Sequence, residues 1–401
     1  MDEDSMYYDD ENGTSCEYLG TEFIEGKIYL IGVFATMIAI LSIVFNTFFT
    51  IVFLSNRSIR KSSVFYFGIL AVLDTIMAFN YLAVMSLPVY MDYYQYVPVY
   101  HVFLSYFRLI LTESNWAIFS SMLLILLATT ERLLRTFDGE KVLKLRRFLE
   151  RHRPSVSLLC ILIAVPYKAC VYWEISVSYK PHCESEFSKY EIVAGPFALI
   201  PEYNFWWMFI TRNVVDRILP FFLLVAMNYT IFMTLKKDYK RSDGKSSIHE
   251  KNGISLATNR RSLRDATRAL ISIVSMYLMS QFPQVLLTFW ETFDKESLVQ
   301  LNEFYSYLND ILSILTLLSS CLRFPVYCSC NHLIYTSSKD TLSEISRMFL
   351  QEDKTTKVYE PISSTEKNCS SIIDKNTQSS ESELTKVPGV IYNDKLNEWQ
   401  L

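Results

Sequence analysis

Apolar positions in this chain gather into long runs that are separated by shorter polar connections. Seven runs contain the roughly 20 mostly apolar residues that a helix needs to cross a bilayer. They lie near residues 28–54, 64–88, 101–130, 155–177, 211–235, 267–290 and 304–329. The pattern predicts an all-α membrane protein, a seven-transmembrane helix bundle whose membrane domain covers residues 28–330.

Polar composition separates the other parts of the chain. Residues 1–27 are acidic and lack the basic start and apolar core of a cleavable signal peptide, so the first run is expected to insert as its own signal. Residues 331–350 have the pattern of a short amphipathic helix that lies on the membrane. Residues 351–401 are polar and rich in Ser and Thr, which predicts a disordered tail.

Basic residues are distributed unevenly among the connections. Lys and Arg crowd the connections after the first, third and fifth runs, whereas the opposite connections are acidic or neutral. Because positively charged loops stay in the cytoplasm, the N-terminus is expected outside the cell and the C-terminus inside. The sequence thus predicts a multi-pass plasma-membrane protein. Asn12, in Asn12-Gly13-Thr14, is then a glycosylation candidate on the outer side.

Polar side chains within the runs are few, and their positions suggest roles. Asn46 and Asp74 lie in the first and second runs, and Ser121 lies in the third, about three helical turns from Arg132. A lone carboxylate inside a bilayer predicts a functional site. The alternative is a simple interhelical hydrogen bond between Asp74 and Asn46. Glu131 and Arg132 form an acid–base dipeptide at the cytoplasmic edge of the third run.

Proline in a spanning helix frees a backbone carbonyl and permits a kink. The kink candidates are Pro220, Pro283 and Pro325, in the fifth, sixth and seventh runs.

In this order the residues resemble the rhodopsin-like (class A) G-protein-coupled receptors, over roughly residues 28–350. The carriers are Asn46, the run Leu70-Ala71-Val72-Leu73-Asp74, Glu131-Arg132-Leu133, Pro220, Pro283 and Phe324-Pro325-Val326-Tyr327-Cys328. None of these is specific alone, but their succession, about one in each run, is specific. The departures from the family pattern are similar to those of invertebrate, particularly nematode, receptors for FMRFamide-type neuropeptides.

The resemblance implies an activation mechanism at the inner end of the bundle. Arg132 would pair with Glu131 at rest and contact a heterotrimeric G protein when the sixth helix moves outward, while Tyr327 moves inward. Leu263 stands where the family's sixth helix often has an acid. Asp265 is therefore the candidate clamp on Arg132, and a weakly held resting state is expected.

The resemblance also implies that Asn46, Asp74 and Ser121 line a central polar site, which often holds a sodium ion in the family. Arg323 stands where the family's Asn-Pro-x-x-Tyr motif begins with asparagine. If its guanidinium faces Asp74, it would take the place of the ion and keep the carboxylate ionised. The alternative is that Arg323 turns towards cytoplasmic water. No cofactor and no other metal is expected.

Cysteine positions differ from the family pattern. Phe107 stands where the third run usually carries cysteine, so the family's disulfide to the second outer connection cannot form. Cys183 then lacks its usual partner, and Cys16 is the candidate replacement, since these two are the only cysteines in predicted extracellular segments. Cys328 and Cys330, at the end of the last run, are palmitoylation candidates, with a structural role as the alternative.

The outer half of the bundle is polar and is the expected ligand site. By the resemblance, Ser114 replaces the aspartate of amine receptors and Leu317 replaces the retinal-binding lysine of opsins, so neither ligand class is expected. Acidic outer connections favour a basic ligand, and a short amidated peptide carrying Arg and Phe fits best. The candidate ligand contacts are Glu113, Ser114, Asn115, Arg212, Asp216, Gln281, Gln284, Glu291 and Asp310.

Two other functions remain open. One is a chemosensory receptor for a small molecule. The other is a seven-span transporter or channel, which is less favoured because the deep charges are mainly Asp74 and Arg323. The histidines are dispersed without nucleophile or metal spacing, so an enzyme is not predicted. Expected partners are an extracellular peptide, a heterotrimeric G protein, the membrane and, through a phosphorylated tail, arrestin, but not nucleic acid.

Overall fold

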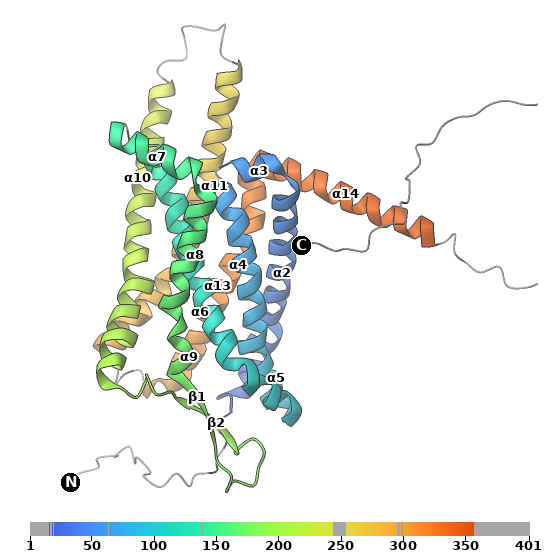
Figure 1. Cartoon of the computed structure of the whole chain (residues 1–401), viewed down its shortest axis with the longest axis vertical. Helices are drawn as coiled ribbons and strands as arrows, with labels where there is room; N and C mark the ends of the chain where they lie inside the picture. The colour runs from blue at the N-terminus through green and yellow to red at the C-terminus, as the bar shows by residue number, and fades with distance from the viewer. Residues whose placement is uncertain are drawn as a thin grey trace, which may run out of the picture. The chain divides into compact units, whose positions relative to one another are not determined.

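The computed structural model describes residues 16, 18, 20–62, 64–137, 139–243, 254–294, 297 and 300–356. Residues up to Met348 form one compact unit, and the chain from Phe349 onward forms a second. In the first unit, seven helical rods are each long and apolar enough to cross a membrane, and they run side by side (Figure 1). Rods one to seven are Ile24–Ser55, Phe65–Tyr94, Val97–Leu134, Arg153–Glu174, Tyr203–Thr234, Leu270–Phe293 and Asn302–Cys330.

All seven rods contain α-helix, and rods one, two and five also contain wider π-helical segments (η). The elements are α1 (Ile24–Lys27), η1 (Ile28–Ala35), α2 (Thr36–Ser55), α3 (Arg57–Lys61), α4 (Phe65–Tyr81), η2 (Leu82–Ser86), α5 (Leu87–Tyr94), α6 (Val97–Leu134), α7 (Glu140–Arg151), α8 (Arg153–Ala169), α9 (Val171–Glu174), β1 (Ile175–Tyr179), β2 (Tyr190–Ala194), η3 (Tyr203–Thr211), η4 (Asn213–Ile218), α10 (Leu219–Asp243), α11 (Ile254–Phe293), α13 (Asn302–Cys330) and α14 (His332–Thr356).

The seven predicted runs match the seven rods, with shifts at their ends. Rod five begins at Tyr203 rather than near residue 211, and α6 begins at Val97. The amphipathic helix predicted at residues 331–350 is present as α14 but continues to Thr356, into the expected tail. Residues 357–401 and the sequon at Asn12 lie outside the described residues. Pro220 lies at the junction of η4 and α10, whereas Pro283 and Pro325 lie inside α11 and α13.

Rod three is the central element of the bundle. Its helix α6 packs against α4, α8 and α10, while α2 packs against α4 and α13, and α11 packs against α10 and α13. Close packing of α2 on α4 requires Gly68, because a side chain there would meet the ring of Phe53 at 2.3 Å. The main core cluster lies among these helices and includes Phe49, Phe67 and Tyr327.

Many apolar side chains on the flanks of the rods are exposed. Ile40, Leu41 and Val44 on α2 and Leu158 and Leu162 on α8 are all more than two-fifths exposed. A monomeric soluble protein rarely exposes contiguous apolar surface of this kind, whereas a helix surrounded by lipid requires it.

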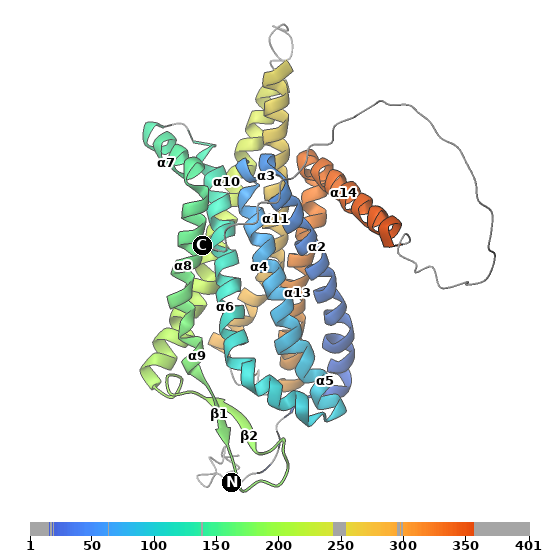
Figure 2. The same ribbon diagram turned by 45° about the vertical axis from the view of Figure 1, so that its right-hand side comes forward.

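The two ends of the bundle differ. One end carries the antiparallel hairpin β1–β2, which the sequence did not predict and which pairs Ile175 with Ala194 and Tyr179 with Tyr190. We call it the hairpin end. The other carries α3 and α7, and we call it the α3 end; the same separation is visible after a 45° turn (Figure 2). Gly195 permits the close return of β2, because a side chain there would meet the carbonyl oxygen of Trp173 at 2.3 Å.

Candidate functional site

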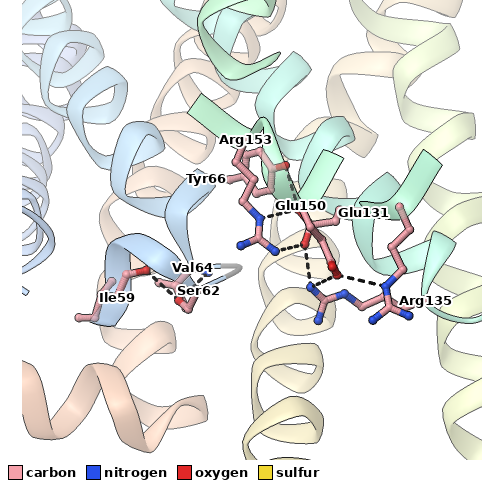
Figure 3. Close-up of polar contacts among 9 residues, drawn as sticks. Ile59, Ser62, Val64, Tyr66, Glu131, Arg135, Glu150 and Arg153 are labelled. Carbon is pink, nitrogen blue, oxygen red and sulfur yellow. Dashed lines mark hydrogen bonds and ion pairs between the residues drawn. The ribbon is translucent and has the colours of Figure 1, made fainter. Parts of the chain in front are cut away.

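The carboxylate of Glu131 is the centre of a buried polar cluster at the α3 end (Figure 3). Tyr66 of α4 donates a hydrogen bond to one oxygen at 2.9 Å, and Arg153, the first residue of α8, donates to both oxygens at 2.8 and 2.6 Å. Arg135, one turn further along the chain, adds a contact at 2.9 Å. Because a buried carboxylate needs partners, this cluster fixes rod three against rods two and four.

The same cluster connects to α7. Arg135 also contacts Glu150 of α7 at 2.8 Å, and Arg146 contacts the same Glu150 oxygen at 3.1 Å. The short connection before α4 is fixed separately by Ser62, whose hydroxyl donates to the carbonyl of Ile59 and accepts from the amide of Val64 (Figure 3).

Arg132 is buried beside this cluster, at 6% exposure. The resemblance implied that Arg132 pairs with Glu131 at rest, and this stays a prediction; the ion pairs of Glu131 described here run to Arg135 and Arg153. Arg135 reaches Glu131 because it lies one turn away on the same face of the helix. The proposed clamp, Asp265, lies in α11, but its side chain is outside the described part of the chain.

A second buried ion pair lies deeper in the bundle. Arg323 of α13 donates from Nη1 to both oxygens of Asp74 on α4, at 2.5 and 2.6 Å, and the two residues are 3% and 0% exposed. Of the two orientations open from the sequence, Arg323 therefore adopts the one that faces Asp74. This site does not fit a sodium ion. The carboxylate oxygens of Asp74 would have to bind the ion, and the guanidinium of Arg323 already engages both of them.

The other predicted members of the central site make different contacts. Asn46 donates to the carbonyl and hydroxyl of Ser42 on its own helix, and the hydroxyl of Ser121 lies 3.7 Å from the sulfur of Met77. The Tyr327 ring stacks on Phe67 with centroids 4.7 Å apart, and its buried hydroxyl has no hydrogen-bond partner among the described residues.

Two ionic contacts join rods four and five in the hairpin half of the bundle. Asp216 of η4 accepts from Lys168 of α8 and, at 3.0 Å, from the hydroxyl of Tyr167. Arg212 donates to both oxygens of Glu174 at 2.5 and 2.6 Å. Lys168 and Glu174 are both buried, at 4% exposure. Arg212 and Asp216, predicted as ligand contacts, are thus bound to rod four.

The remaining ligand candidates divide into two groups. Asp310 pairs with Lys27 of rod one at 3.2 Å, and Glu291 accepts from Tyr305 at 2.8 Å. Asn115 donates to the carbonyl of Leu111 in its own helix at 2.9 Å. The others are half-buried: Glu113 and Ser114 on α6, and Gln281 and Gln284 on α11.

The N-terminal segment crosses the hairpin end and is tied down at two points. The disulfide considered from the sequence, Cys16–Cys183, is present, with the two Cα atoms 5.4 Å apart. Asp92 of α5 accepts from the hydroxyl of Tyr18 at 2.7 Å and from the hydroxyl of Thr21 at 2.6 Å. Burial, together with the hydrogen bond to Asp92, raises the pKa of the Tyr18 hydroxyl, so it stays protonated as a donor. We call Cys16, Tyr18 and residues 20–23 the N-terminal strap.

Rod three holds the hairpin without the family's usual cysteine. The hydroxyl of Tyr100 donates to the carbonyls of Phe187 and Tyr190 at 3.1 and 2.5 Å, and its ring packs against Phe187. Tyr18 of the strap packs on both rings. Aromatic packing and the disulfide to Cys16 thus take over the anchoring expected from a cysteine at Phe107.

A cavity of about 490 Å³ lies at the α3 end, where α11, α13 and α14 meet. Both palmitoylation candidates, Cys328 and Cys330, line it with Arg268 and His332. The two cysteines are half-buried free thiols that approach serine hydroxyls, at 4.0 Å and 3.9 Å respectively. The modification stays a prediction.

Sequence reasoning missed four residues that the structure makes central. Each is an ionisable residue inside or at the edge of a predicted run, and burial in an ion pair is the usual reason for such a position. The rule that predicts a functional site at Asp74 also applies to these four residues. They are Lys27, Arg153, Lys168 and Glu174.

No protein-family model matches this sequence, and no curated protein sequence matches it significantly.

Proposed function

We propose that this protein is a G-protein-coupled receptor of the rhodopsin-like type, a seven-span plasma-membrane protein activated by a short extracellular peptide. The observation that carries the proposal is the buried dipeptide Glu131-Arg132 at one end of rod three, with Glu131 held by side chains from rods two and four. In this reading the α3 end faces the cytoplasm and the hairpin end faces outward.

The cluster around Glu131 suggests how a resting state is held. Arg153 and Tyr66 fix rod three to its neighbours while Arg132 stays buried. Movement of α11 away from rod three would expose Arg132 to a partner at the α3 end. The partnerless hydroxyl of Tyr327 supports this reading, since Tyr327 can move inward without losing a hydrogen bond to any residue described here.

The hairpin end supports a basic peptide as the ligand. Exposed carboxylates gather there on the strap, the start of rod one, the hairpin connection and the start of rod five: Glu22, Glu25, Glu184, Glu186 and Glu202. Among the described residues, only Glu186 of these has a Lys or Arg ion-pair partner, Lys189. A surface of this charge raises the local concentration and the association rate of a cationic peptide.

Two measurements test the proposal. Cells that express the full chain are screened with amidated peptides while calcium and cyclic AMP are recorded. The active peptide is then used with the purified receptor to stimulate nucleotide exchange on heterotrimeric G proteins. Arg132→Gln should abolish exchange without lowering surface expression, whereas Arg147→Gln on the exposed side of α7 should not. Exchange that is unchanged by Arg132→Gln would refute the proposal.

A transporter is the second candidate, because the buried charges are more numerous than the sequence suggested. Ion pairs join rods one and seven, two and seven, and four and five, and ionisable groups on several helices are typical of transport proteins. Each of these groups has an opposite charge as its partner. Uptake of ions or solutes by proteoliposomes that contain the purified chain, in the absence of any G-protein response, would favour this second function.

A further inference from the structure

Helix α7 presents an exposed face of unusual composition. Lys141, Lys144, Leu145 and Phe148 follow one another at the spacing i, i+3, i+4 and i+7, which places them on one side of the helix. All four are exposed, Leu145 at 49% and Phe148 at 54%. We call these four residues the Phe148 face.

Other positions of α7 attach the helix to the bundle. Leu149 is buried at 8% exposure, and Glu150 pairs with Arg135 as described above. Glu150 is two residues from Phe148, or about 160° around the helix in the shorter sense. The Phe148 face therefore points away from the Glu131 cluster.

Charge and position indicate which partner the face would meet. Helix α7 has five Lys or Arg residues and two Glu, a net charge of +3. It ends at Arg151, and α8 begins at Arg153, so one residue separates α7 from a rod whose apolar flank starts at Leu158. About 7.5 Å of helix lies between Arg153 and Leu158. The last turn of α7 must then lie close to the surface of any bilayer that rod four crosses.

We propose that α7 is an interfacial helix whose Phe148 face lies in an anionic lipid leaflet. Phe148 and Leu145 enter the boundary of the acyl chains, and Lys141 and Lys144 extend to the lipid phosphates. The inference rests on the membrane-spanning part of the proposed function and adds to it. Through Glu150 and Arg135, the lipid surface would help to hold α7 against the Glu131 cluster.

The experiment uses the full chain in nanodiscs with acyl chains brominated near the headgroup, which quench nearby tryptophan. Phe148→Trp is compared with Leu143→Trp, a matched control on the same helix. Leu143 is also exposed, but it lies about 140° away around the helix. The emission of the six native tryptophans, measured in the wild-type chain, is subtracted.

In nanodiscs of phosphatidylcholine and phosphatidylserine, the tryptophan at position 148 should lose most of its added emission and the one at 143 little. The difference in quenching between positions 148 and 143 should be smaller in nanodiscs of phosphatidylcholine alone. It should also be smaller in the double variant Lys141→Gln/Lys144→Gln. Equal quenching at 143 and 148, or quenching that is indifferent to phosphatidylserine and to the lysines, would overturn the proposal. So would an unquenched tryptophan at 148 whose emission changes only when a purified G protein is added, since the face would then bind protein.

Nucleotide exchange is measured in the same nanodiscs. Absence of exchange together with lipid quenching at position 148 would refute the receptor function and leave this inference in place. Exchange without quenching at position 148 would refute the lipid contact of α7 and leave the receptor function in place.

Discussion

At the scale of single residues, the buried pair Asp74–Arg323 is the most consequential contact. Both groups are almost fully removed from solvent, and their mutual charge is what makes that burial tolerable. Removing one partner leaves the other charge uncompensated, whereas removing both leaves only neutral groups of similar size. The pair therefore allows a test in which the double variant is more stable than either single one.

Asp74→Asn alone should lower the free energy of unfolding by about 3–5 kcal/mol, and Arg323→Gln by a similar amount. The double variant Asp74→Asn/Arg323→Gln should recover most of that loss. Melting temperatures of the detergent-solubilised chain provide the measurement. Losses that simply add in the double variant would contradict a direct contact between the two side chains.

The same contact predicts how the protein responds to sodium. A bound ion stabilises the folded state in proportion to its occupancy, and both oxygens of Asp74 are already engaged by Arg323. The melting temperature should therefore be the same in sodium chloride and in potassium chloride at equal concentration. Arg323→Gln, which frees the carboxylate, is the variant in which a sodium-specific rise could appear. A rise in the wild-type chain would show that a cation competes with Arg323.

Ligand-free signalling should depend on the bonds to Glu131. Arg153→Gln removes two charge-assisted hydrogen bonds, each of about 1.5–3 kcal/mol, and should raise basal G-protein activity several-fold at equal surface expression. Arg146→Gln is the matched control, because its partner Glu150 is a half-exposed surface acid and such pairs contribute little. If basal activity rises equally in both variants, the effect is a general loss of stability at this end of the bundle, and the Glu131 cluster does not hold the resting state.

The sequence could supply the residues of these sites more readily than their pairing. A carboxylate inside an apolar run is visible from the sequence, and this pattern alone predicts a functional site at Asp74. Its partner lies 249 positions away and depends on how rod seven is rotated about its axis. Glu131 is visible in the same way, but two of its hydrogen-bond partners, Tyr66 and Arg153, belong to other helices.

At the scale of elements, length and apolarity were enough to predict the rods, and local features were not enough to predict their details. The hairpin β1–β2 has five-residue strands without a distinctive alternation, and its stability comes from contacts of Tyr100 and Cys183 with distant segments. The π-helical segments η3 and η4 form where Arg212 and Asp216 meet rod four. Tertiary contacts of this kind have no local sequence signature.

The N-terminal strap should be an independent source of stability. Its disulfide closes a loop with a sequence separation of 167 residues, and native disulfides typically contribute about 2–4 kcal/mol. A membrane-impermeant reductant should lower the melting temperature of the wild-type chain. The reductant should not change the melting temperature of Cys16→Ser/Cys183→Ser, because this variant lacks the disulfide and already melts at a lower temperature than the wild type. Cys160→Ser, a half-buried free thiol on α8, is the control and should behave like the wild type. An unchanged wild-type melting temperature under reduction would contradict the prediction.

At the scale of the whole molecule, the two ends carry opposite charge. The connection after rod one contains Arg57, Arg60 and Lys61, and the connection after rod three includes α7 with its net charge of +3. The hairpin end carries the exposed carboxylates named above. Because membrane insertion retains positive connections in the cytoplasm, this separation should determine which way the bundle crosses the bilayer.

Sequons on both sides of the predicted membrane domain make that orientation measurable. If the hairpin end faces outward, Asn12 is exposed to glycosylation, while Asn56 and Asn368 lie on the cytoplasmic side and stay unmodified. Asn12→Gln should then abolish the mobility shift that a glycosidase produces in the chain from cell membranes, whereas Asn56→Gln and Asn368→Gln should leave it unchanged. A glycan on Asn368 would place the C-terminus outside. It would reverse the assignment of both ends, and with it the placement of the Glu131 cluster on the side where a G protein binds.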